Sequence, residues 1–251
     1  MLELKNIKLS VEGEKGQFDI LKNIDLTLQK NKIYVITGPN GGGKSSVAKI
    51  IMGIYQPTSG DIFFEGQNIT GLDITERAKL GIGYAFQNPP RFKGIKVREL
   101  LELAAGQNTE INLCDLLMDV GLCAQDYLER EVNNSLSGGE LKRIEIATIL
   151  ARNLKLAVFD EPEAGIDLWS FQKLAETFAN IHDKYQTSIV IISHQERILR
   201  LADEVILIAN GEVSEITSQE NFLGEIAKID ADCMCSKTCY KGVIPSAKCN
   251  R

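Results

Sequence analysis

No apolar run in the sequence approaches the ~18 residues that a membrane-spanning helix requires. Cationic residues are not in excess either: 28 Lys and Arg stand against 34 Asp and Glu, a formal net charge of -6. This balance argues against a general nucleic-acid coat and against a polybasic membrane anchor. The first five residues carry charges where a signal peptide would need an apolar stretch, so a soluble, cytoplasmic protein is expected.

Cysteine is scarce over most of the chain. Six cysteines among 251 residues do not make a disulfide scaffold. Cys114 and Cys123 stand singly in apolar helical surroundings, where core thiols are expected. The other four crowd the end of the chain, at Cys233, Cys235, Cys239 and Cys249. A composition of 44% hydrophobic and 25% charged residues rules out a disordered chain and predicts a folded core.

The hydrophobic pattern predicts an α/β fold. Apolar residues alternate over 2–11 and again over 20–28, which predicts two half-buried antiparallel strands. Buried parallel strands are predicted by three short apolar runs: 33–37, 156–159 and 188–193. Between about 88 and 150, helical patterns replace strand patterns, so a helical insert within the sheet domain is expected.

A glycine-rich motif follows the predicted strand at 33–37. Its sequence, Gly38-Pro-Asn-Gly-Gly-Gly43-Lys44-Ser45, fits G-x-x-x-x-G-K-[ST] and opens an apolar helix, the context expected for a P-loop. Backbone N–H groups of such a loop cradle phosphates, the Lys side chain reaches the β/γ-phosphates, and the Ser hydroxyl binds Mg²⁺. The candidate nucleotide-binding residues here are Gly38, Pro39, Asn40, Gly41, Gly42, Gly43, Lys44, Ser45 and Ser46.

Two carboxylates end another predicted buried strand, at 156–159. Asp160 is positioned to hold Mg²⁺ beside the P-loop, and Glu161 is a candidate general base that polarises water. Alone, such a pair is typical of a solvated strand end. Together with a P-loop it predicts a nucleoside triphosphatase, with Lys44, Glu161 and His194 as the candidate catalytic residues.

The stretch Leu136-Ser137-Gly138-Gly139-Glu140 resembles the signature motif of ABC-type ATPases. Gln87 precedes this motif, and Asp167 and His194 follow it, in the order of that family's Q-loop, signature, D-loop and switch histidine. Ser137 and Glu140 also have the spacing of a helix capping box, and both interpretations can hold. The resemblance covers nearly the whole chain. It implies the fold of an ABC ATPase: an N-terminal antiparallel β subdomain, a parallel-sheet core and a helical insert.

The resemblance also implies a mechanism. Two ATPase domains would close head to tail, so that Ser137, Gly138 and Gly139 of one copy contact the γ-phosphate bound by the other. Glu161 would orient the attacking water and His194 would contact the γ-phosphate. Mg²⁺ would be held by Ser45, Gln87 and Asp160, with Gln87 linking it to the helical insert. An ATP-dependent homodimer and no nucleic-acid partner are expected. Phe18 is a weak candidate for stacking on adenine, and a core position is equally open.

Within the family, the sequence is similar to the Suf-system iron–sulfur cluster assembly ATPase (SufC-like). The residues concerned are the run from Glu140 to Ile146 and the run from Asp160 to Asp167. The resemblance implies a SufB/SufD-type soluble scaffold as partner, docked near Phe92. The alternative is the ATP-binding subunit of a membrane ABC transporter, which would have a membrane partner.

The cysteine-rich end forms a second unit in the predicted division: 1–230 as the ATPase domain and 231–251 as a tail. Thiolates spaced as closely as Cys233, Cys235 and Cys239, with Cys249 beyond, can ligate zinc or an iron–sulfur cluster. The spacing matches no standard pattern, so a tail with incidental cysteines stays an alternative. Trp169 is expected to pack in the core, with a dimer face as the second interpretation.

Overall fold

The computed structural model describes residues 1–13, 16–106, 111–152, 154–164, 166 and 168–224. The strands are β1 (Leu2–Gly13), β2 (Gly16–Leu28), β3 (Ile33–Thr37), β4 (Ser59–Phe64), β5 (Gln67–Asn68), β6 (Ile82–Ala85), β7 (Leu156–Asp160), β8 (Ser188–Ile192), β9 (Glu204–Ala209) and β10 (Glu212–Ser218). The helices are α1 (Lys44–Met52), α2 (Ile74–Lys79), α3 (Val97–Ala105), α4 (Leu113–Asp119), α5 (Ala124–Tyr127), α6 (Gly138–Leu150), α7 (Leu168–Tyr185) and α8 (Glu196–Leu199).

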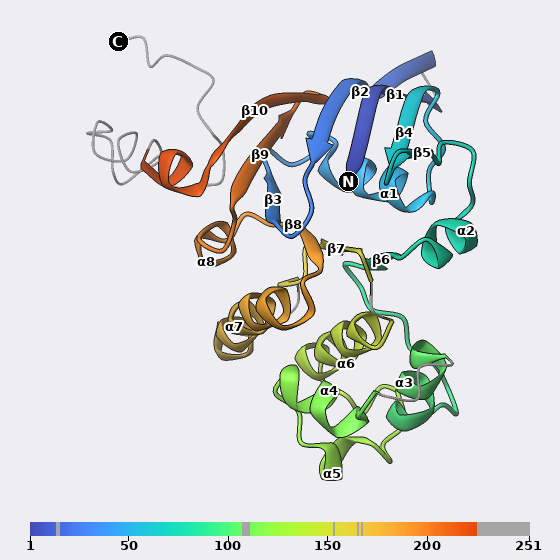
Figure 1. Cartoon of the computed structure of the whole chain (residues 1–251), viewed down its shortest axis with the longest axis vertical. Helices are drawn as coiled ribbons and strands as arrows, with labels where there is room; N and C mark the ends of the chain where they lie inside the picture. The colour runs from blue at the N-terminus through green and yellow to red at the C-terminus, as the bar shows by residue number, and fades with distance from the viewer. Residues whose placement is uncertain (14–15, 107–110, 153, 165, 167, 225–251) are drawn as a thin grey trace.

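Over the described residues the strands form one sheet in the order β5-β4-β1-β2-β10-β9-β3-β8-β7-β6. β5, β4, β1 and β2 pair with one another antiparallel, as do β10 and β9, whereas β9, β3, β8, β7 and β6 run parallel. A short parallel pairing of β10 with β2 joins the two parts. The predicted antiparallel subdomain and parallel core are therefore both present, as Figure 1 shows.

Two hydrophobic cores lie on opposite faces of the parallel strands. One core packs α1 against the antiparallel strands and against alternate residues such as Ile36, Val158 and Val190. The other packs α3, α4, α6 and α7 against the intervening residues, such as Val35 and Phe159. Because both faces are covered, β3, β7 and β8 are buried at every position, which explains their continuous apolar runs.

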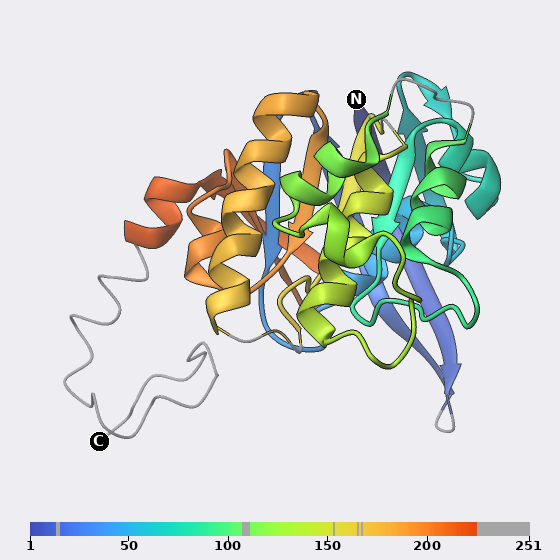
Figure 2. The same cartoon turned by 90° about the horizontal axis from the view of Figure 1, so that it is seen from below.

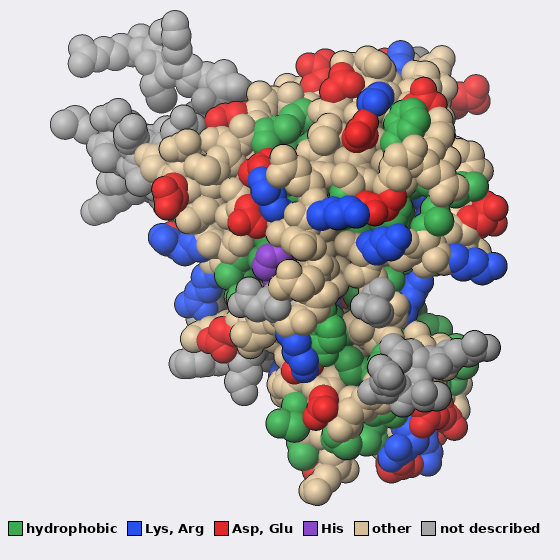
Figure 3. Space-filling view, viewed as in Figure 1, with side chains coloured by type: hydrophobic (Ala, Val, Ile, Leu, Met, Phe, Trp, Pro, Cys, Tyr) green, Lys and Arg blue, Asp and Glu red, His purple; other side chains and the backbone are tan. Residues whose placement is uncertain are grey.

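The helical part lies between β6 and β7 in the chain and forms a lobe beside the parallel edge of the sheet (Figures 1 and 2). Its helices α3, α4 and α6 bury apolar faces against one another, as the patterns over 88–150 predict. Among the described helices, none combines the length and hydropathy needed to cross a bilayer. In Figure 3, side chains of both charge signs are spread over the face in view.

The structure tests the burial expected for Cys114, Cys123 and Phe18. Cys114 and Cys123 are exposed, so their prediction as core thiols is wrong. Helix α4 turns Leu116, Leu117 and Val120 inward, which places Cys114 on its outer face, and Cys123 precedes α5 as its N-cap. Phe18 is 55% exposed, which excludes the core alternative for it. The side chain of Trp169 lies outside the described residues, as do Asp167 and the whole segment 225–251.

Candidate functional site

The glycine-rich loop runs from the end of β3 into α1. Gly38 and Gly43 have φ angles of 135° and 106°, a region that disfavours residues with a side chain. A Cβ on Gly38 would lie 2.0 Å from the carbonyl oxygen of Ile208, so the loop can approach β9 only with glycine there. The loop thus brings the N-terminus of α1 to the carboxyl edge of the parallel strands.

The N-terminus of α1 is open, whereas those of α2 and α6 are closed by their own side chains. Of the described residues, no side chain caps α1 and no acidic residue lies in its first turn. In α2 and α6 a complete capping box occupies the first amides. The free N–H groups and the positive end of the helix dipole of α1 therefore form an anion site suited to phosphates.

Lys44 lies at the centre of this anion site and is only 4% exposed. Its ammonium group donates to the carbonyl oxygens of Gly38 and Pro39, both at 2.9 Å. Burial lowers the pKa of Lys44, and the negative charges of Glu161 and Asp160 partly oppose this shift. Among the described residues, the hydrogen bonds of this cation go to two neutral carbonyls, from which it could turn to a phosphate oxygen.

Hard oxygen ligands converge where the sequence predicts Mg²⁺. The Ser45 hydroxyl donates to Oδ1 of Asp160 at 2.9 Å, although the two residues are far apart in the chain. The Tyr84 hydroxyl donates to Oδ2 of the same carboxylate at 2.6 Å. A hydroxyl and a carboxylate facing each other are the kind of donors that Mg²⁺ accepts, so these residues fit the ion. Tyr84 is absent from the predicted site because a tyrosine in a strand carries no motif.

Glu161 leaves the buried strand through a left-handed backbone conformation, with φ of 44°. This conformation is uncommon for a residue with a side chain and is typical of functional turns. The Gln87 amide donates to Oε2 of Glu161, so the two predicted residues meet although 74 positions separate them. The Q-loop amide and the candidate general base therefore lie in direct contact.

His194 stands just past β8, at the same edge of the sheet. Its Nδ1 lies 3.5 Å from the hydroxyl of Thr37, the last residue of β3. Desolvation and the nearby charge of Lys44 lower the pKa of His194, while Glu161 acts in the opposite direction. This shift of the pKa favours the neutral form of the imidazole. Ser193 beneath it donates to Glu163 at 2.6 Å and accepts the amide of Gln195, two contacts that sequence patterns do not reveal.

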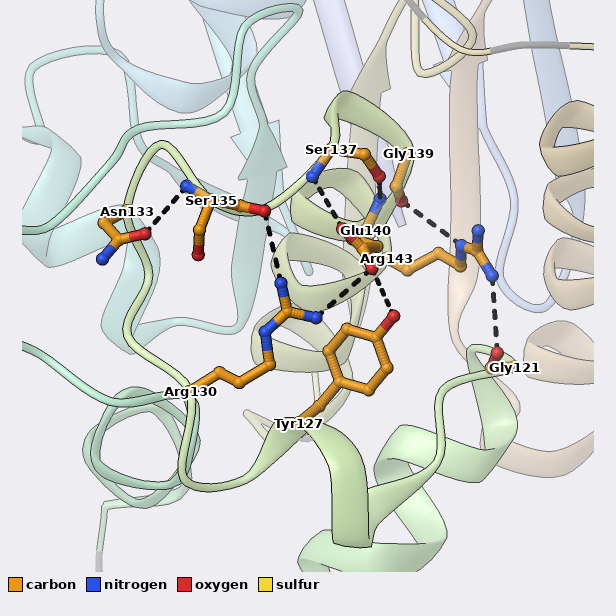
Figure 4. A network of polar contacts seen from close by, with 9 residues as sticks. All are labelled: Gly121, Tyr127, Arg130, Asn133, Ser135, Ser137, Gly139, Glu140 and Arg143. Carbon is orange, nitrogen blue, oxygen red and sulfur yellow. Dashed lines mark hydrogen bonds and ion pairs between the residues drawn. The ribbon is translucent and has the colours of Figure 1, made fainter.

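The signature residues belong to a different cluster, shown in Figure 4. The backbone N–H of Glu140 donates to the Ser137 hydroxyl at 3.2 Å. The backbone N–H of Ser137 donates to the Glu140 carboxylate at 2.6 Å, which completes the predicted capping box. The Tyr127 hydroxyl and the Arg130 guanidinium also bind this carboxylate. Ser137 and Gly138 stay exposed while Gly139 is buried, so the start of α6 presents a polar surface outward.

The structure therefore divides the predicted residues into two groups. Lys44, Ser45, Gln87, Asp160, Glu161 and His194 gather around the open end of α1. Ser137, Gly138 and Gly139 lie in the helical lobe, with their hydrogen-bond partners in that lobe. Among the described residues no group of three or more His, Cys, Asp or Glu is placed to hold a metal ion. The four tail cysteines lie outside those residues.

A groove of about 350 Å³ opens beside the Q-loop, between α3 and α6. Its lining is mostly apolar and includes Phe86, Phe92, Leu103 and Ile144, with Glu145 as an acidic member. Phe86, Phe92 and Leu103 are 46%, 37% and 82% exposed, a concentration of large apolar side chains that is unusual at a free surface. The groove adjoins Gln87 without belonging to the nucleotide site.

Comparisons with known proteins agree with this geometry. A family model described as "ABC transporter" matches residues 21–164. The chain is 42% identical to an uncharacterized ABC transporter ATP-binding protein of Methanocaldococcus jannaschii, over 91% of this chain and 92% of that one. It is 34% identical to a probable ATP-dependent transporter, ycf16, of Cyanophora paradoxa, over 85% and 86% of the two chains.

Solved structures support the fold. The ATP-binding cassette MJ0796, in a dimeric post-hydrolysis state with ADP and Pi, superposes with a TM-score of 0.78. It is 24% identical, and the match covers 87% of this chain and 99% of that one. On the strength of the family match, the sequence relatives and the ordered motifs, this chain belongs to the ABC transporter family and is an ABC-type ATPase.

Proposed function

We propose that the residues around the open end of α1 bind and hydrolyse ATP. The phosphates lie on the free amides of α1, and Lys44 turns from the carbonyls of Gly38 and Pro39 to neutralise them. Ser45 and Asp160 hold Mg²⁺, which when bound neutralises charge on the phosphate oxygens. The observation that carries this proposal is that buried Lys44 and the contacting pair Ser45 and Asp160 meet at the uncapped N-terminus of α1.

Glu161 is the proposed general base. Its carboxylate accepts from Gln87, which orients it at the edge of the sheet near Lys44. It accepts a proton from the attacking water, and neutral His194 donates to the γ-phosphate from the other side. Lys44→Ala should abolish ATP binding, while Glu161→Gln should bind ATP and stop turnover. Equal hydrolysis rates for Glu161→Gln and the unmodified chain would refute the role of Glu161.

The proposed active form is a head-to-tail pair of chains. Ser137 and Gly138 are exposed at the start of α6, and their partners lie in the helical lobe rather than at the P-loop. In a pair, these groups of one copy would donate to the γ-phosphate bound by the other. One chain carries one set of motifs, so two copies would form two equivalent sites.

As its biological role, we propose that the chain drives an iron–sulfur cluster assembly scaffold of the SufB/SufD type and acts in the cytoplasm. What supports this role is the resemblance of two sequence runs, Glu140 to Ile146 and Asp160 to Asp167, to the Suf-system ATPase. A membrane transporter subunit is the second candidate, favoured by the names of two relatives, an ABC transporter ATP-binding protein and a probable ATP-dependent transporter.

The groove beside the Q-loop is the proposed docking surface for the partner. Its exposed apolar residues lie next to Gln87, where occupancy of the γ-phosphate position would be sensed. Phe92→Asp should weaken capture of the partner from the native host while leaving ATP binding intact. Recovery of a soluble scaffold subunit without detergent supports the assembly role. Recovery of a multi-span protein from membranes would replace it with the transporter role.

The tail cysteines are proposed to bind zinc or an iron–sulfur cluster. Three of them, Cys233, Cys235 and Cys239, lie within seven residues, and lysines nearby favour the thiolate form. Protein isolated without oxygen should contain zinc, or iron and sulfide, in an amount that falls when these three become Ser. Metal-free protein after such isolation would contradict this assignment.

A further inference from the structure

A buried charged pair on α6 holds the backbone at the start of the Q-loop. Glu145 Oε1 accepts the amide of Phe86 at 2.8 Å, and the ammonium of Lys142 donates to the carbonyl oxygen of the same residue. Lys142 and Glu145 are paired with each other at 2.9 Å and are one helical turn apart. The backbone N–H and the backbone C=O of Phe86 are thus both hydrogen-bonded by side chains of a single helix, α6.

This pair is unusually placed for charged residues. The side chains are only 2% and 9% exposed, and burial raises the pKa of Glu145. A buried ion pair is often no more stabilising than apolar residues of the same size, so fold stability gives little reason for it. The side chain of Phe86, in contrast, is 46% exposed and contacts Tyr84 edge-on. The pair therefore fixes the backbone of Phe86 rather than its ring.

The held residue directly precedes Gln87, whose amide contacts the candidate base Glu161. The helix that holds it is capped at its N-terminus by the signature residue Ser137. One continuous chain of contacts therefore leads from the start of α6, through Lys142 and Glu145, to Phe86, Gln87 and Glu161. Because Phe86 is held at both its N–H and its C=O, the Q-loop root cannot shift along α6 without breaking two bonds.

We propose that Lys142 and Glu145 are positioning residues that fasten the Q-loop root to the signature helix, so that Gln87 reaches Glu161 only when α6 is in place. Within the described part of the chain, their polar contacts are to each other and to the backbone of Phe86, not to the residues proposed to bind the phosphates. A movement of the signature helix against a second copy, or of a partner in the adjoining groove, is transmitted to Glu161 through this fastening. This inference rests on the proposed roles of Gln87 and Glu161 in hydrolysis.

The test is a mutant cycle on ATP hydrolysis by the full chain. Lys142→Met with Glu145→Leu removes both charges and both bonds to Phe86 at nearly constant volume. We expect kcat to fall roughly 10- to 100-fold, because a small displacement of a positioned group is costly in rate. The KM for ATP should change little, since Lys44 and α1 are untouched. Added to Gln87→Ala, the pair should lower kcat no further.

Matched variants separate positioning from simple loss of stability. Ile146→Ala removes a fully buried side chain of the same helix. It should lower the melting temperature. When it is combined with Gln87→Ala, the factors by which the two variants change kcat should multiply. Lys142→Met with Glu145→Gln keeps the acceptor for the Phe86 amide and should recover part of kcat. It also serves in the cycle if the first pair does not fold, as judged by its thermal melt.

Two results would overturn the inference. If the charged-pair variant and Gln87→Ala lower kcat by factors that multiply when combined, the charged pair and Gln87 act independently. A loss in KM and kcat together, in proportion to the loss of melting temperature, would show a structural role only. Failure of the proposed hydrolysis chemistry is distinguishable, because it appears as normal turnover in Glu161→Gln with Lys142 and Glu145 intact.

Discussion

At the scale of single residues, Tyr84 decides how the Asp160 carboxylate faces the site. Its buried hydroxyl donates a hydrogen bond to Oδ2 of Asp160, and Oδ1 of the same carboxylate accepts the hydroxyl of Ser45. Tyr84→Phe should raise the Mg²⁺ concentration for half-maximal hydrolysis by roughly 10- to 100-fold, since a hydrogen bond to a charged group is worth ~1.5–3 kcal/mol. Hydrolysis measured across a Mg²⁺ titration checks this expectation.

Tyr34→Phe is the matched control for that titration. Tyr34 is also buried, and its hydroxyl accepts the amide of Gln29 at 2.8 Å near the start of β3, at the opposite end of that strand from the P-loop. Its loss should lower stability and leave the Mg²⁺ dependence unchanged. Identical shifts in both variants would mean that Tyr84 acts through stability alone.

Glu140 gives the signature cap a pH dependence. Burial opposes its ionisation, yet the bonds from Tyr127 and Ser137 outweigh this and lower the pKa of Glu140 to about 2, from an ordinary value of 4.5. Its carboxylate therefore stabilises the fold in full above pH 4.5, and this contribution is lost as the pH falls toward 2. The gap in melting temperature between the unmodified chain and Glu140→Gln should shrink over this range. A gap independent of pH would contradict the assignment.

Residue contacts divide into those that sequence patterns predict and those that they do not. The Ser137–Glu140 cap was predictable because its partners are three residues apart and the helix dictates their geometry. The bonds from Tyr84 to Asp160 and from Glu145 to Phe86 were not, since their partners are 76 and 59 residues apart. Such contacts depend on strand order and helix placement, which no local pattern encodes.

At the scale of elements, Arg77 of α2 closes the C-terminal end of the P-loop helix. It is fully buried, and its guanidinium binds the carbonyl oxygens of Ile50 and Ile51, with further bonds to Thr70 and Leu72. The last carbonyls of a helix have no partner in the next turn; the carbonyl of Ile50 also accepts the N–H of Gly53, and Arg77 adds a second donor there and binds Ile51. Arg77→Met should lower the free energy of unfolding by about 3 kcal/mol or more, because it leaves several buried acceptors without a donor.

Denaturant unfolding measures this loss, with Arg200→Met as the control. Arg200 is the exposed C-cap residue of α8, where it pairs with Glu196 one turn away at 2.5 Å. An exposed pair of this kind contributes ~0–1 kcal/mol. A loss for Arg77→Met no larger than that for Arg200→Met would show that the α1 carbonyls find other partners.

Elements with one dominant local signal were predicted well. The apolar runs of β3, β7 and β8 follow directly from burial on both faces, and the antiparallel β1 and β2 from alternation. Burial in the helical lobe was less predictable. A one-residue rotation of α4 decides whether Cys114 faces the core or solvent, and only the packing of Leu116 and Leu117 settles it.

At the scale of the whole molecule, one chain separates its two sets of motif residues. The phosphate site lies at the sheet edge, and the exposed start of α6 lies in the helical lobe. The proposed head-to-tail pair would bring the two sets together, because the helical lobe of each copy would then contact the phosphate site of the other copy. Ser137→Arg should block pairing by placing a bulky cation at the interface and should leave nucleotide binding to α1 intact.

The mass of the Glu161→Gln chain in solution tests this account most directly. Without a general base the chain should retain ATP, and the bound γ-phosphate should hold two copies together. Light scattering should then give twice the mass of one chain with ATP and Mg²⁺, and the mass of one chain with ADP. A single mass in every nucleotide state would contradict the account.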